Sequence, residues 1–291
     1  MYKAILILIS IVIISCSKND NDKDDIALDQ NIYQNNLLED NELYEKAFTY
    51  IANNQLNKAL IELKKLEVLF PSSKYSNKGI LVTAYVNFLK KDYEKTRAIA
   101  KSYKEYYPGS KDIEYANYLE AMTYYVLIKK PNYSQKNAIK ALEKFNFVLN
   151  AYPDSEYTID IITRIQIIND TLASSKLLKA NFYLDKKNYN AALIYLKDIF
   201  ENHNSSYSIQ ETIYLMIEIY YLIDEKELAK YYAAVLVYNF PESIWYEKSY
   251  NLINNIKGES DNQKNWFEKY NPIKILYKEQ KEENFEIQRI D

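Results

Sequence analysis

Few side chains in this chain have the types and spacing that catalysis requires. It contains one histidine, His203, and only three glycines, too few to build a phosphate-cradling loop. Its carboxylates are scattered, and close pairs such as Asp24-Asp25 and Glu282-Glu283 lie in polar end segments, where no pocket would shift their pKa. We therefore expect no enzymatic activity, no catalytic residue, no metal site and no cofactor.

The only cysteine, Cys16, stands in a context that predicts lipid attachment. It follows an apolar run over residues 4–14, which is too short to span a bilayer and is preceded by Lys3. The end of this segment, Ile13-Ile14-Ser15-Cys16, resembles a bacterial lipobox, in which the cysteine is acylated and becomes the new N-terminus. A lone cysteine also excludes an internal disulfide. An ordinary cleaved signal with an incidental cysteine is the alternative.

Processing at Cys16 would divide the N-terminal part of the chain. Residues 1–15 are then a signal peptide, and residues 16–40, which are polar and lack periodicity, form a lipidated flexible tether. Ser17 follows the cysteine, where an aspartate would favour retention in the inner membrane. The sequence therefore predicts a protein anchored to the outer membrane by lipid.

A short motif recurs beyond the tether and predicts the elements of the fold. It consists of an aromatic residue, a proline and, two residues after the proline, a serine. Four full copies and one copy without the proline occur at Phe70-Pro71, Tyr107-Pro108, Tyr152-Pro153, His203-Asn204 and Phe240-Pro241. The proline ends one helix and the serine is a good N-cap for the next. Each motif thus marks the boundary between two helices.

Small residues at fixed distances before each motif indicate how the helices pack. One lies twelve residues before each proline position, and a second lies twelve residues earlier in most copies. These residues are Ala59, Thr96, Ala141, Ala192 and Ala229 in the second helices, and Ala47, Ala84, Ala121 and Ala180 in the first helices. A small residue in each of two helices lets the helices cross closely. The pattern predicts tandem helix pairs.

The predicted fold is all-α, a tetratricopeptide-type helical-repeat solenoid of five helix pairs over residues 41–257. The repeats end near residues 71, 108, 153, 204 and 241, and a capping helix follows within residues 242–257. Residues 258–291 form a polar, partly disordered tail, whose apolar islands leave open a partner-binding segment. The formal charge of −3 and the lack of a basic stripe argue against a nucleic-acid partner.

Two insertions interrupt the regular spacing. Ala121 and Ala141 are separated by 20 residues where the other repeats have 12, and the extra eight residues fall in the loop-like segment 129–134. From Pro153 to Ala180 there are 27 residues, whereas 13 separate Pro71 from Ala84. Because residues 157–187 contain no glycine or proline, these fourteen extra residues predict one long helix.

The first helix of each pair is expected to line a concave surface. Relative to the small residue of each first helix, positions −6, −3, +1 and +4 should share this face. The aromatic residues at these positions in repeats one to three are Tyr44, Phe48, Tyr85, Phe88, Tyr115, Tyr118 and Tyr125. Such a groove suits an extended peptide with aromatic and apolar side chains. The alternative is that individual rings only fill gaps between helices.

The order of these features resembles the BamD family, the lipoprotein component of the outer-membrane β-barrel assembly machinery. The resemblance covers about residues 42–256. It rests on the strings at residues 70–76, 112–119, 152–157, 233–236 and 239–246, the last of which contains Trp245-Tyr246 as in alphaproteobacterial forms. The sequence departs from the family at Tyr133-Ser134-Gln135, where many relatives carry Arg-Asp-Gln, and at Asn204, which replaces a proline.

The resemblance implies a location on the periplasmic face of the outer membrane. The N-terminal repeats would receive the C-terminal strand of unfolded barrel proteins, and the C-terminal repeats would dock on the periplasmic domains of the barrel component, BamA. Small accessory lipoproteins are possible further partners. In repeat five, Glu211, Tyr214 and Glu218 share one helix face, because they are three and four residues apart. We expect them to dock on the barrel component; simple solvation of the two carboxylates is the alternative.

Two rival functions remain open at this point. The chain fits a tetratricopeptide scaffold lipoprotein of the cell envelope that handles no barrel clients. It also fits the regulatory subunit of an envelope enzyme. The stoichiometric partner of the acylated protein would separate these possibilities.

Overall fold

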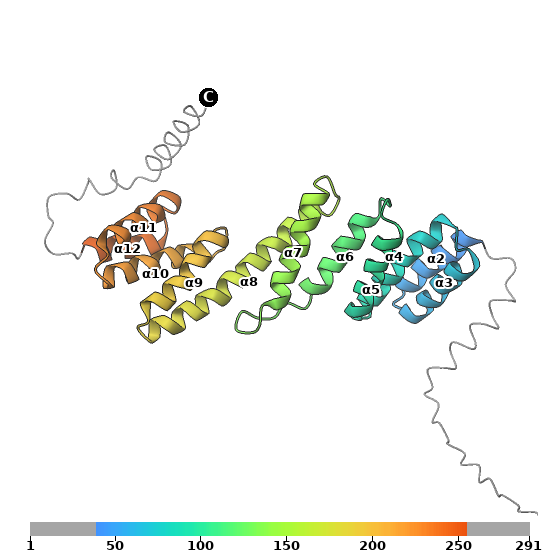
Figure 1. Ribbon diagram of the computed structural model, residues 1–291, viewed down its shortest axis with the longest axis horizontal. Coiled ribbons are helices and arrows are strands. Elements are labelled where there is room, and N and C mark those ends of the chain that lie inside the picture. Colours follow the sequence, from blue (N-terminus) through green and yellow to red (C-terminus); the bar gives the residue numbers. More distant parts are fainter. Residues whose placement is uncertain (1–38, 255–291) are drawn as a thin grey trace, which may run out of the picture. The chain divides into compact units, whose positions relative to one another are not determined.

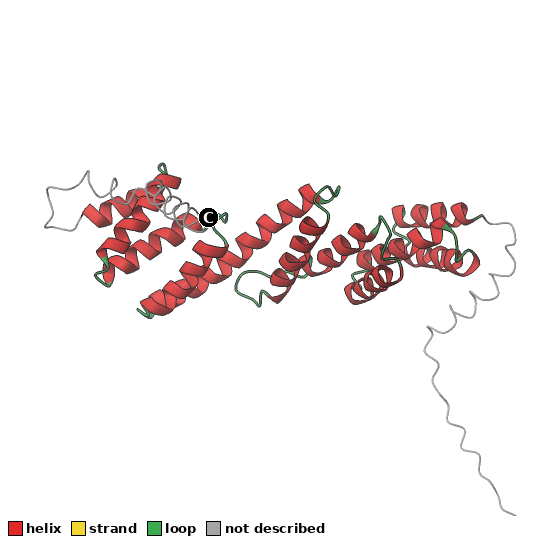
Figure 2. Ribbon diagram, turned by 45° about the horizontal axis from the view of Figure 1, so that its top comes forward, coloured by secondary structure: helices red, strands yellow, loops and turns green. Residues whose placement is uncertain are grey.

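The structure, a computed structural model, describes residues 39–254, and every regular element in this range is a helix (Figure 1, Figure 2). The five pairs are α2 (Asp40–Ala52) with α3 (Leu56–Leu69), α4 (Lys74–Leu89) with α5 (Tyr93–Tyr106), α6 (Ile113–Tyr125) with α7 (Lys136–Ala151), α8 (Thr158–Asp185) with α9 (Tyr189–Asn202), and α10 (Ile209–Leu222) with α11 (Lys226–Asn239). A last helix, α12 (Ile244–Asn254), follows. The predicted all-α fold of five helix pairs and a final helix is confirmed.

The chain divides into two compact units, Met1–Pro108 and Gly109–Asp291. Within the described residues, the first unit holds α2–α5 and the second holds α6–α12. The expectation of one continuous solenoid over residues 41–257 stays a prediction. Cys16, the signal peptide, nearly all of the tether and the polar tail lie outside the described residues.

In the first unit, α3 packs against both α2 and α4, and α4 packs against α5. The small residues Ala47, Ala59 and Ala84 are fully buried, as their spacing predicts. At Gly79 the helices α3 and α4 are in close contact, because a Cβ there would lie only 3.2 Å from a methyl carbon of Leu66. The recurring small residues therefore do what the sequence predicts and let the paired helices cross closely.

The second unit has two hydrophobic cores that share one helix. The first core joins α6 and α7 to the N-terminal half of α8, through Ile161, Ile168 and Leu172. The second joins the C-terminal half of α8 to α9, α10, α11 and α12, beginning at the neighbouring residue Ala173. The 28-residue α8 is the long helix predicted from the fourteen-residue insertion, and it would measure about 42 Å.

The other insertion lies where the sequence places it. α6 ends at Tyr125 and α7 begins at Lys136, so residues 126–135 form a loop that the other repeats lack. Gln135 closes this loop, because its side-chain Nε2 donates hydrogen bonds to the carbonyl oxygens of Lys130 and Tyr133. At the other end of the chain, α12 packs on α10 and α11 and covers the last pair.

The turn inside the remaining four pairs is the same. Its central residue has a positive φ of 55° at Asn54, 64° at Lys91, 56° at Lys187 and 64° at Asp224. The next residue donates its N–H to a carbonyl five residues earlier, at 2.8–2.9 Å. This bond satisfies a carbonyl at the end of the first helix. These turns have no clear sequence signal, because none of them contains glycine, the usual residue at a positive φ.

Candidate functional site

A pair of stacked or tilted rings links successive helix pairs in three places. The pairs are Tyr44 with Tyr75 (5.3 Å between ring centroids), Tyr118 with Tyr157 (4.5 Å) and Tyr214 with Trp245 (5.2 Å). In each pair, one ring belongs to α2, α6 or α10 and lies three residues before the small-residue position of that helix. The other ring lies at the start of the helix that begins the next repeat, α4 or α8, or at the start of α12. The rings predicted to face a groove therefore also hold neighbouring repeats together.

The motif serine positions the second ring of each pair. The backbone N–H of the ring residue donates to the serine Oγ two residues earlier: Tyr75 to Ser73 at 3.0 Å, Tyr157 to Ser155 at 3.2 Å, and Trp245 to Ser243 at 3.1 Å. The predicted N-cap is thus present at Ser73 and Ser243. It is wrong for the other three copies, because α6, α8 and α10 begin two residues later and have Asp112, Tyr157 and Ser208 as their N-cap residues. The aromatic residue two positions after the serine occurs in three of the five motif copies and is the sequence signal for this contact.

In the first unit, the predicted groove residues lie at the surface of α2 and α4. Phe48 is 41% exposed and its ring lies 5.0 Å from that of the half-buried Tyr44. On α4, Tyr85 and Phe88 are half-buried, and Phe88 contacts Tyr93 at 5.5 Å. Four rings of the predicted set therefore remain partly open to solvent on two first helices.

A pocket in the same unit lies on a different face of α4. It has a volume of about 560 Å³ and is lined by α3, α4 and α5, with Ser76, Gly79 and Thr83 contributed by α4. At 100° per residue, these positions point away from Tyr85 and Phe88. None of the predicted groove residues lines this pocket.

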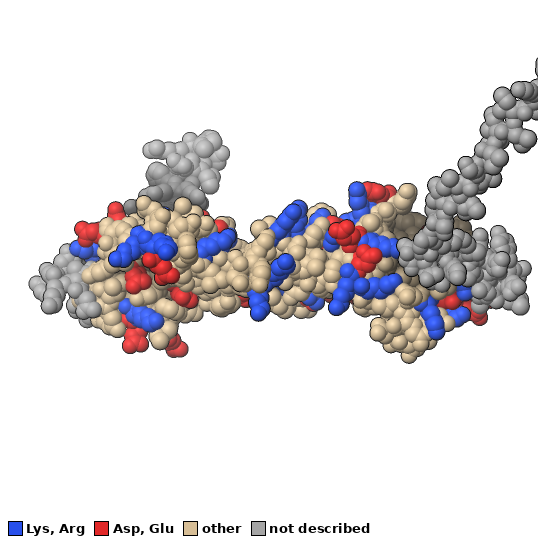
Figure 3. Space-filling view, turned by 90° about the horizontal axis from the view of Figure 1, so that it is seen from below, with Lys and Arg blue, Asp and Glu red and all other residues tan. Residues whose placement is uncertain are grey.

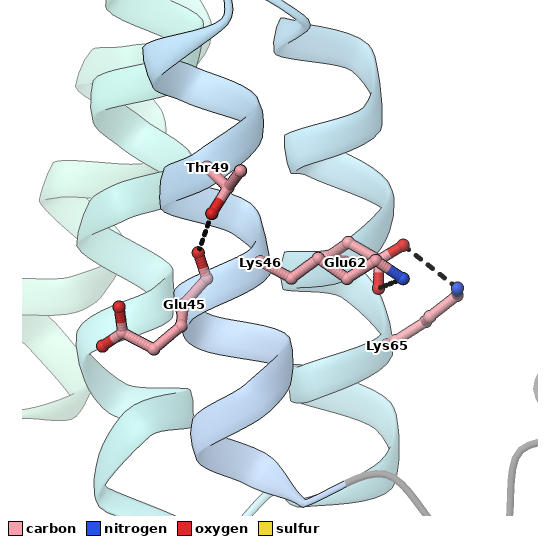
Figure 4. A network of polar contacts seen from close by, with 5 residues as sticks. All are labelled: Glu45, Lys46, Thr49, Glu62 and Lys65. Atoms are coloured by element: carbon pink, nitrogen blue, oxygen red, sulfur yellow. Dashed lines mark hydrogen bonds and ion pairs between the residues drawn. The ribbon is translucent and has the colours of Figure 1, made fainter.

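A buried carboxylate anchors α3 to α2 on the first pair. Glu62 is only 5% exposed, and its two carboxylate oxygens lie 3.6 Å from Lys46 Nζ and 3.2 Å from Lys65 Nζ (Figure 4). Lys46 comes from α2, while Lys65 lies one turn along α3 (Figure 4). A buried charge needs such partners, so this cluster fixes the crossing of the first pair.

In the second unit, the predicted rings are more deeply involved in packing. Tyr115 lies 5.8 Å from Tyr157, and Tyr125 lies edge-on to the buried Phe145 at 6.0 Å. Both Tyr118 and Tyr125 pack against the first core of this unit. These contacts support the gap-filling interpretation for the two rings, and their role in binding a ligand stays a prediction.

A polar cluster on α8 holds the Tyr118 and Tyr125 rings in place. The Tyr118 hydroxyl donates to Asp160 at 2.7 Å, and Arg164 pairs with the same carboxylate while lying 4.7 Å from the centre of the Tyr125 ring. Burial and the Asp160 carboxylate raise the pKa of Tyr118 to about 12. Burial alone would raise the pKa of Asp160, but hydrogen bonds from Arg164 and Tyr118 lower it. The phenol therefore stays protonated beside a carboxylate.

The predicted docking residues of repeat five lie on α10. Glu211, Tyr214 and Glu218 are all half-buried, and neither carboxylate has an ion-pair partner among residues 39–254. Burial and the charge of Glu218 raise the pKa of Tyr214. Lys248 of α12 places its Nζ 4.1 Å from the centre of the Trp245 ring, next to Tyr214. Figure 3 shows acidic and basic side chains mixed over the end that carries α9–α12.

His203 takes the structural role that its place in the motif predicts. It is buried at the end of α9, where Nε2 lies 3.0 Å from Lys176 Nζ and Nδ1 lies 3.1 Å from Asn169 Oδ1. Both partners belong to α8. The imidazole therefore joins α9 to the long helix.

Comparison with known proteins assigns the family. The family model described as "YfiO: Outer membrane lipoprotein" matches residues 37–236, more than half of the chain. This chain belongs to the YfiO family. The match spans α2–α10 and most of α11, so it includes four of the five helix pairs in full. The sequence-based resemblance is confirmed.

Two curated relatives of this YfiO-family chain carry the name "Outer membrane protein assembly factor BamD". The one from Rickettsia prowazekii (strain Madrid E) is 32% identical over 213 residues, which are 73% of this chain and 85% of the relative. The one from Caulobacter vibrioides is 31% identical over 212 residues, 73% of this chain and 70% of the relative. A solved structure titled "Functional Characterization of Pseudomonas Aeruginosa pilF" has 13% identity, 73% and 96% coverage, and a TM-score of 0.25, too low to support a shared fold.

None of the helices within residues 39–254 combines the length and apolar character that crossing a membrane requires.

Proposed function

We propose that this protein is a lipoprotein subunit of the machinery that folds and inserts outer-membrane β-barrel proteins. The observation that carries the proposal is membership of a family described as outer membrane lipoproteins, together with two relatives named as outer membrane protein assembly factors. Anchoring belongs to the proposal: Cys16 carries the lipid and holds the helical units at the periplasmic face of the outer membrane.

The open rings of the first unit support a site for client strands. Phe48, Tyr85 and Phe88 remain partly exposed on α2 and α4, and the strands of outer-membrane barrels are rich in aromatic and apolar residues. An extended strand would place alternate side chains against these rings. The rings of α6 would extend the site only where they are not occupied in packing.

The exposed side of α10 supports a docking surface for a barrel component. Glu211 and Glu218 are half-buried carboxylates without a cation partner in the described part of the chain. A partner that brings Lys or Arg side chains would neutralise them. We propose that the periplasmic domains of a BamA-like protein provide these cations.

The function is tested by identifying what the acylated protein binds. Purification from membranes should recover a barrel protein with periplasmic repeats in stoichiometric amount, and Cys16→Ala should release the protein from the membrane. Recovery of another envelope protein alone would support a scaffold role, and recovery of an enzyme with altered activity would support a regulatory subunit. Either result would overturn the assembly proposal.

Two double variants test the two surfaces separately. Tyr85→Ala with Phe88→Ala should weaken binding of a barrel C-terminal peptide by more than about tenfold, because two contact rings are lost. Tyr106→Ala with Phe147→Ala, which removes exposed rings from second helices, is the matched control. Unchanged peptide affinity in the folded first variant would remove these rings from the site.

The second variant, Glu211→Lys with Glu218→Lys, should weaken docking on the barrel component and leave peptide affinity unchanged. Glu94→Lys with Glu105→Lys makes the same charge change on α5 and serves as its control. A pull-down and a peptide titration on each variant measure both activities. Loss of both activities, or of neither, would contradict the separation of the two surfaces.

A further inference from the structure

A pocket in the second unit lies between the inserted loop, the start of α7 and the long helix α8. It has a volume of about 440 Å³, and its wall is made by the end of the inserted loop at residues 133–135, the first turn of α7 and residues 172–179 of α8. The loop part of the wall exists because of the eight-residue insertion, whereas the α8 residues of the wall occupy the same repeat positions as the α4 residues that line the pocket of the first unit.

The polar wall of this pocket carries positive charge only. Four lysines line it, Lys136, Lys140, Lys176 and Lys179, and no carboxylate does. Lys140 pairs with Glu143 and Lys176 with Asp198. Among residues 39–254, Lys136 has no ion-pair partner, and Lys179 only approaches the face of an aromatic ring. Two cations are thus available to a ligand.

Two neutral side chains at the pocket also have unpaired polar atoms in the described chain, the hydroxyl of Ser175 and the acceptor Oε1 of Gln135. The Ser175 hydroxyl is in a residue that is only 5% exposed, lines the pocket and has no hydrogen-bond partner in the described chain. Its Oγ is open to the pocket rather than enclosed by protein, so the hydroxyl is available to donate to a bound group.

The start of α7 adds further donors to the same wall. The Gln135 side chain does not cap the helix, and the first backbone bond at this end runs from Ile139 N–H to the Gln135 carbonyl. The N–H groups of the first turn are consequently free of helical acceptors and carry the positive end of the helix dipole. Gln135, Lys136 and Ile139 of this turn all line the pocket.

We propose that this pocket binds a phosphate group. A phosphate carries between one and two negative charges near neutral pH and has enough acceptor oxygens for an ammonium, a hydroxyl and a helix N-terminus at once. A carboxylate offers only two oxygens. Ile139 and Leu172 provide apolar wall beside the donors, where the carbon portion of a phosphate ester fits. The inference does not depend on the proposed assembly function.

Calorimetric titration of the full-length protein in non-ionic detergent tests the site, with inorganic phosphate as the first probe. Saturable binding should weaken at least about tenfold in Lys136→Glu with Lys179→Glu, because two cations are replaced by anions. Ser175→Ala should weaken it severalfold without changing thermal stability. The control, Lys95→Glu with Lys111→Glu, makes the same charge change at exposed lysines outside the pocket and should bind as the wild type.

A second probe identifies the source of the phosphate. Tighter binding of dihexanoyl-phosphatidylglycerol than of inorganic phosphate assigns a lipid headgroup, and equal or weaker binding assigns free phosphate. Dihexanoyl-phosphatidylcholine, whose headgroup has no net charge, should bind more weakly than the glycerol lipid. Absence of saturable phosphate binding, or binding that the pocket variants leave unchanged, would overturn the proposal.

Discussion

His203 replaces the aromatic ring of the repeat motif and brings a proton-dependent contact with it. A lysine ammonium can only donate, so Nε2 of His203 must accept from Lys176 and Nδ1–H must donate to Asn169. Protonation of Nε2 would break the first bond and place two cations side by side. Burial, and then the charge of Lys176, lower the pKa of His203, while Asp198 opposes them.

The stability of the α8–α9 contact should therefore depend on pH. The imidazole is neutral in the folded state and has an unfolded pKa of about 6.5, so its contribution is present above that pH. As pH falls below about 6.5, the unfolded chain binds a proton that the folded protein does not, and stability falls by up to about 1.4 kcal/mol per pH unit. Urea unfolding at pH 7.5 and pH 5.5 measures this loss.

The aromatic residue of the other motif copies provides the matched variant. His203→Phe should show a smaller loss of stability between these two pH values than the wild type. The pKa values of Asp160 and Asp198 are lowered, so these carboxylates titrate at more acidic pH than the two values compared. Equal loss in the wild type and in His203→Phe would show that His203 is not the titrating group.

At the scale of the helix, the motif serine connects one repeat to the preceding one. Besides accepting a backbone N–H, Ser73 Oγ donates to Asp40 at 2.5 Å and Ser243 Oγ donates to Gln210 at 2.6 Å. Each acceptor stands at the start of the preceding first helix. Ser206 differs, since its hydroxyl is buried and has no partner in the described chain.

This difference predicts opposite effects of the same substitution. Ser73→Ala and Ser243→Ala should each lower the free energy of unfolding by about 1 kcal/mol, as the loss of a helix cap does. Ser206→Ala removes an unsatisfied hydroxyl and should leave the free energy of unfolding unchanged or raise it. Urea unfolding of the three variants provides the comparison, and a destabilised Ser206→Ala would contradict this account.

The sequence predicts the helices well because their boundaries depend on local chemistry. Proline, serine and the small residues act within one or two turns, so α8 and the inserted loop follow from spacing alone. Which neighbour covers a helix face depends on contacts between distant residues. The positions of apolar residues along one helix do not show that Trp245 partly covers Tyr214. They also do not show that the carboxylate of Glu62 is buried.

At the scale of the whole molecule, the two compact units predict two regions that open independently. Glu62→Gln keeps the size of the side chain but leaves Lys46 and Lys65 without a counter-charge, which should cost about 1–3 kcal/mol. Amide hydrogen exchange should rise in α2–α5 and remain unchanged in α6–α12. The local character of repeat-protein stability is the physical reason.

An exposed ion pair serves as the control for Glu62. Glu143→Gln removes the partner of Lys140 at the surface of α7, where such pairs contribute less than about 1 kcal/mol. Its exchange pattern should match that of the wild type. If Glu62→Gln also raises exchange throughout the second unit, the two units unfold together.

Because α8 belongs to both cores of the second unit, its length sets the distance and the rotation of one core relative to the other. Fourteen residues make about 3.9 turns, so the inserted segment moves the second core about 21 Å along the axis and rotates it by only about 40°. An insertion of nine residues would rotate it by about 180°. Natural length variants in this helix should therefore cluster near whole numbers of turns, at steps of about 7, 11, 14 or 18 residues, because only these lengths keep the orientation of the second core about the helix axis.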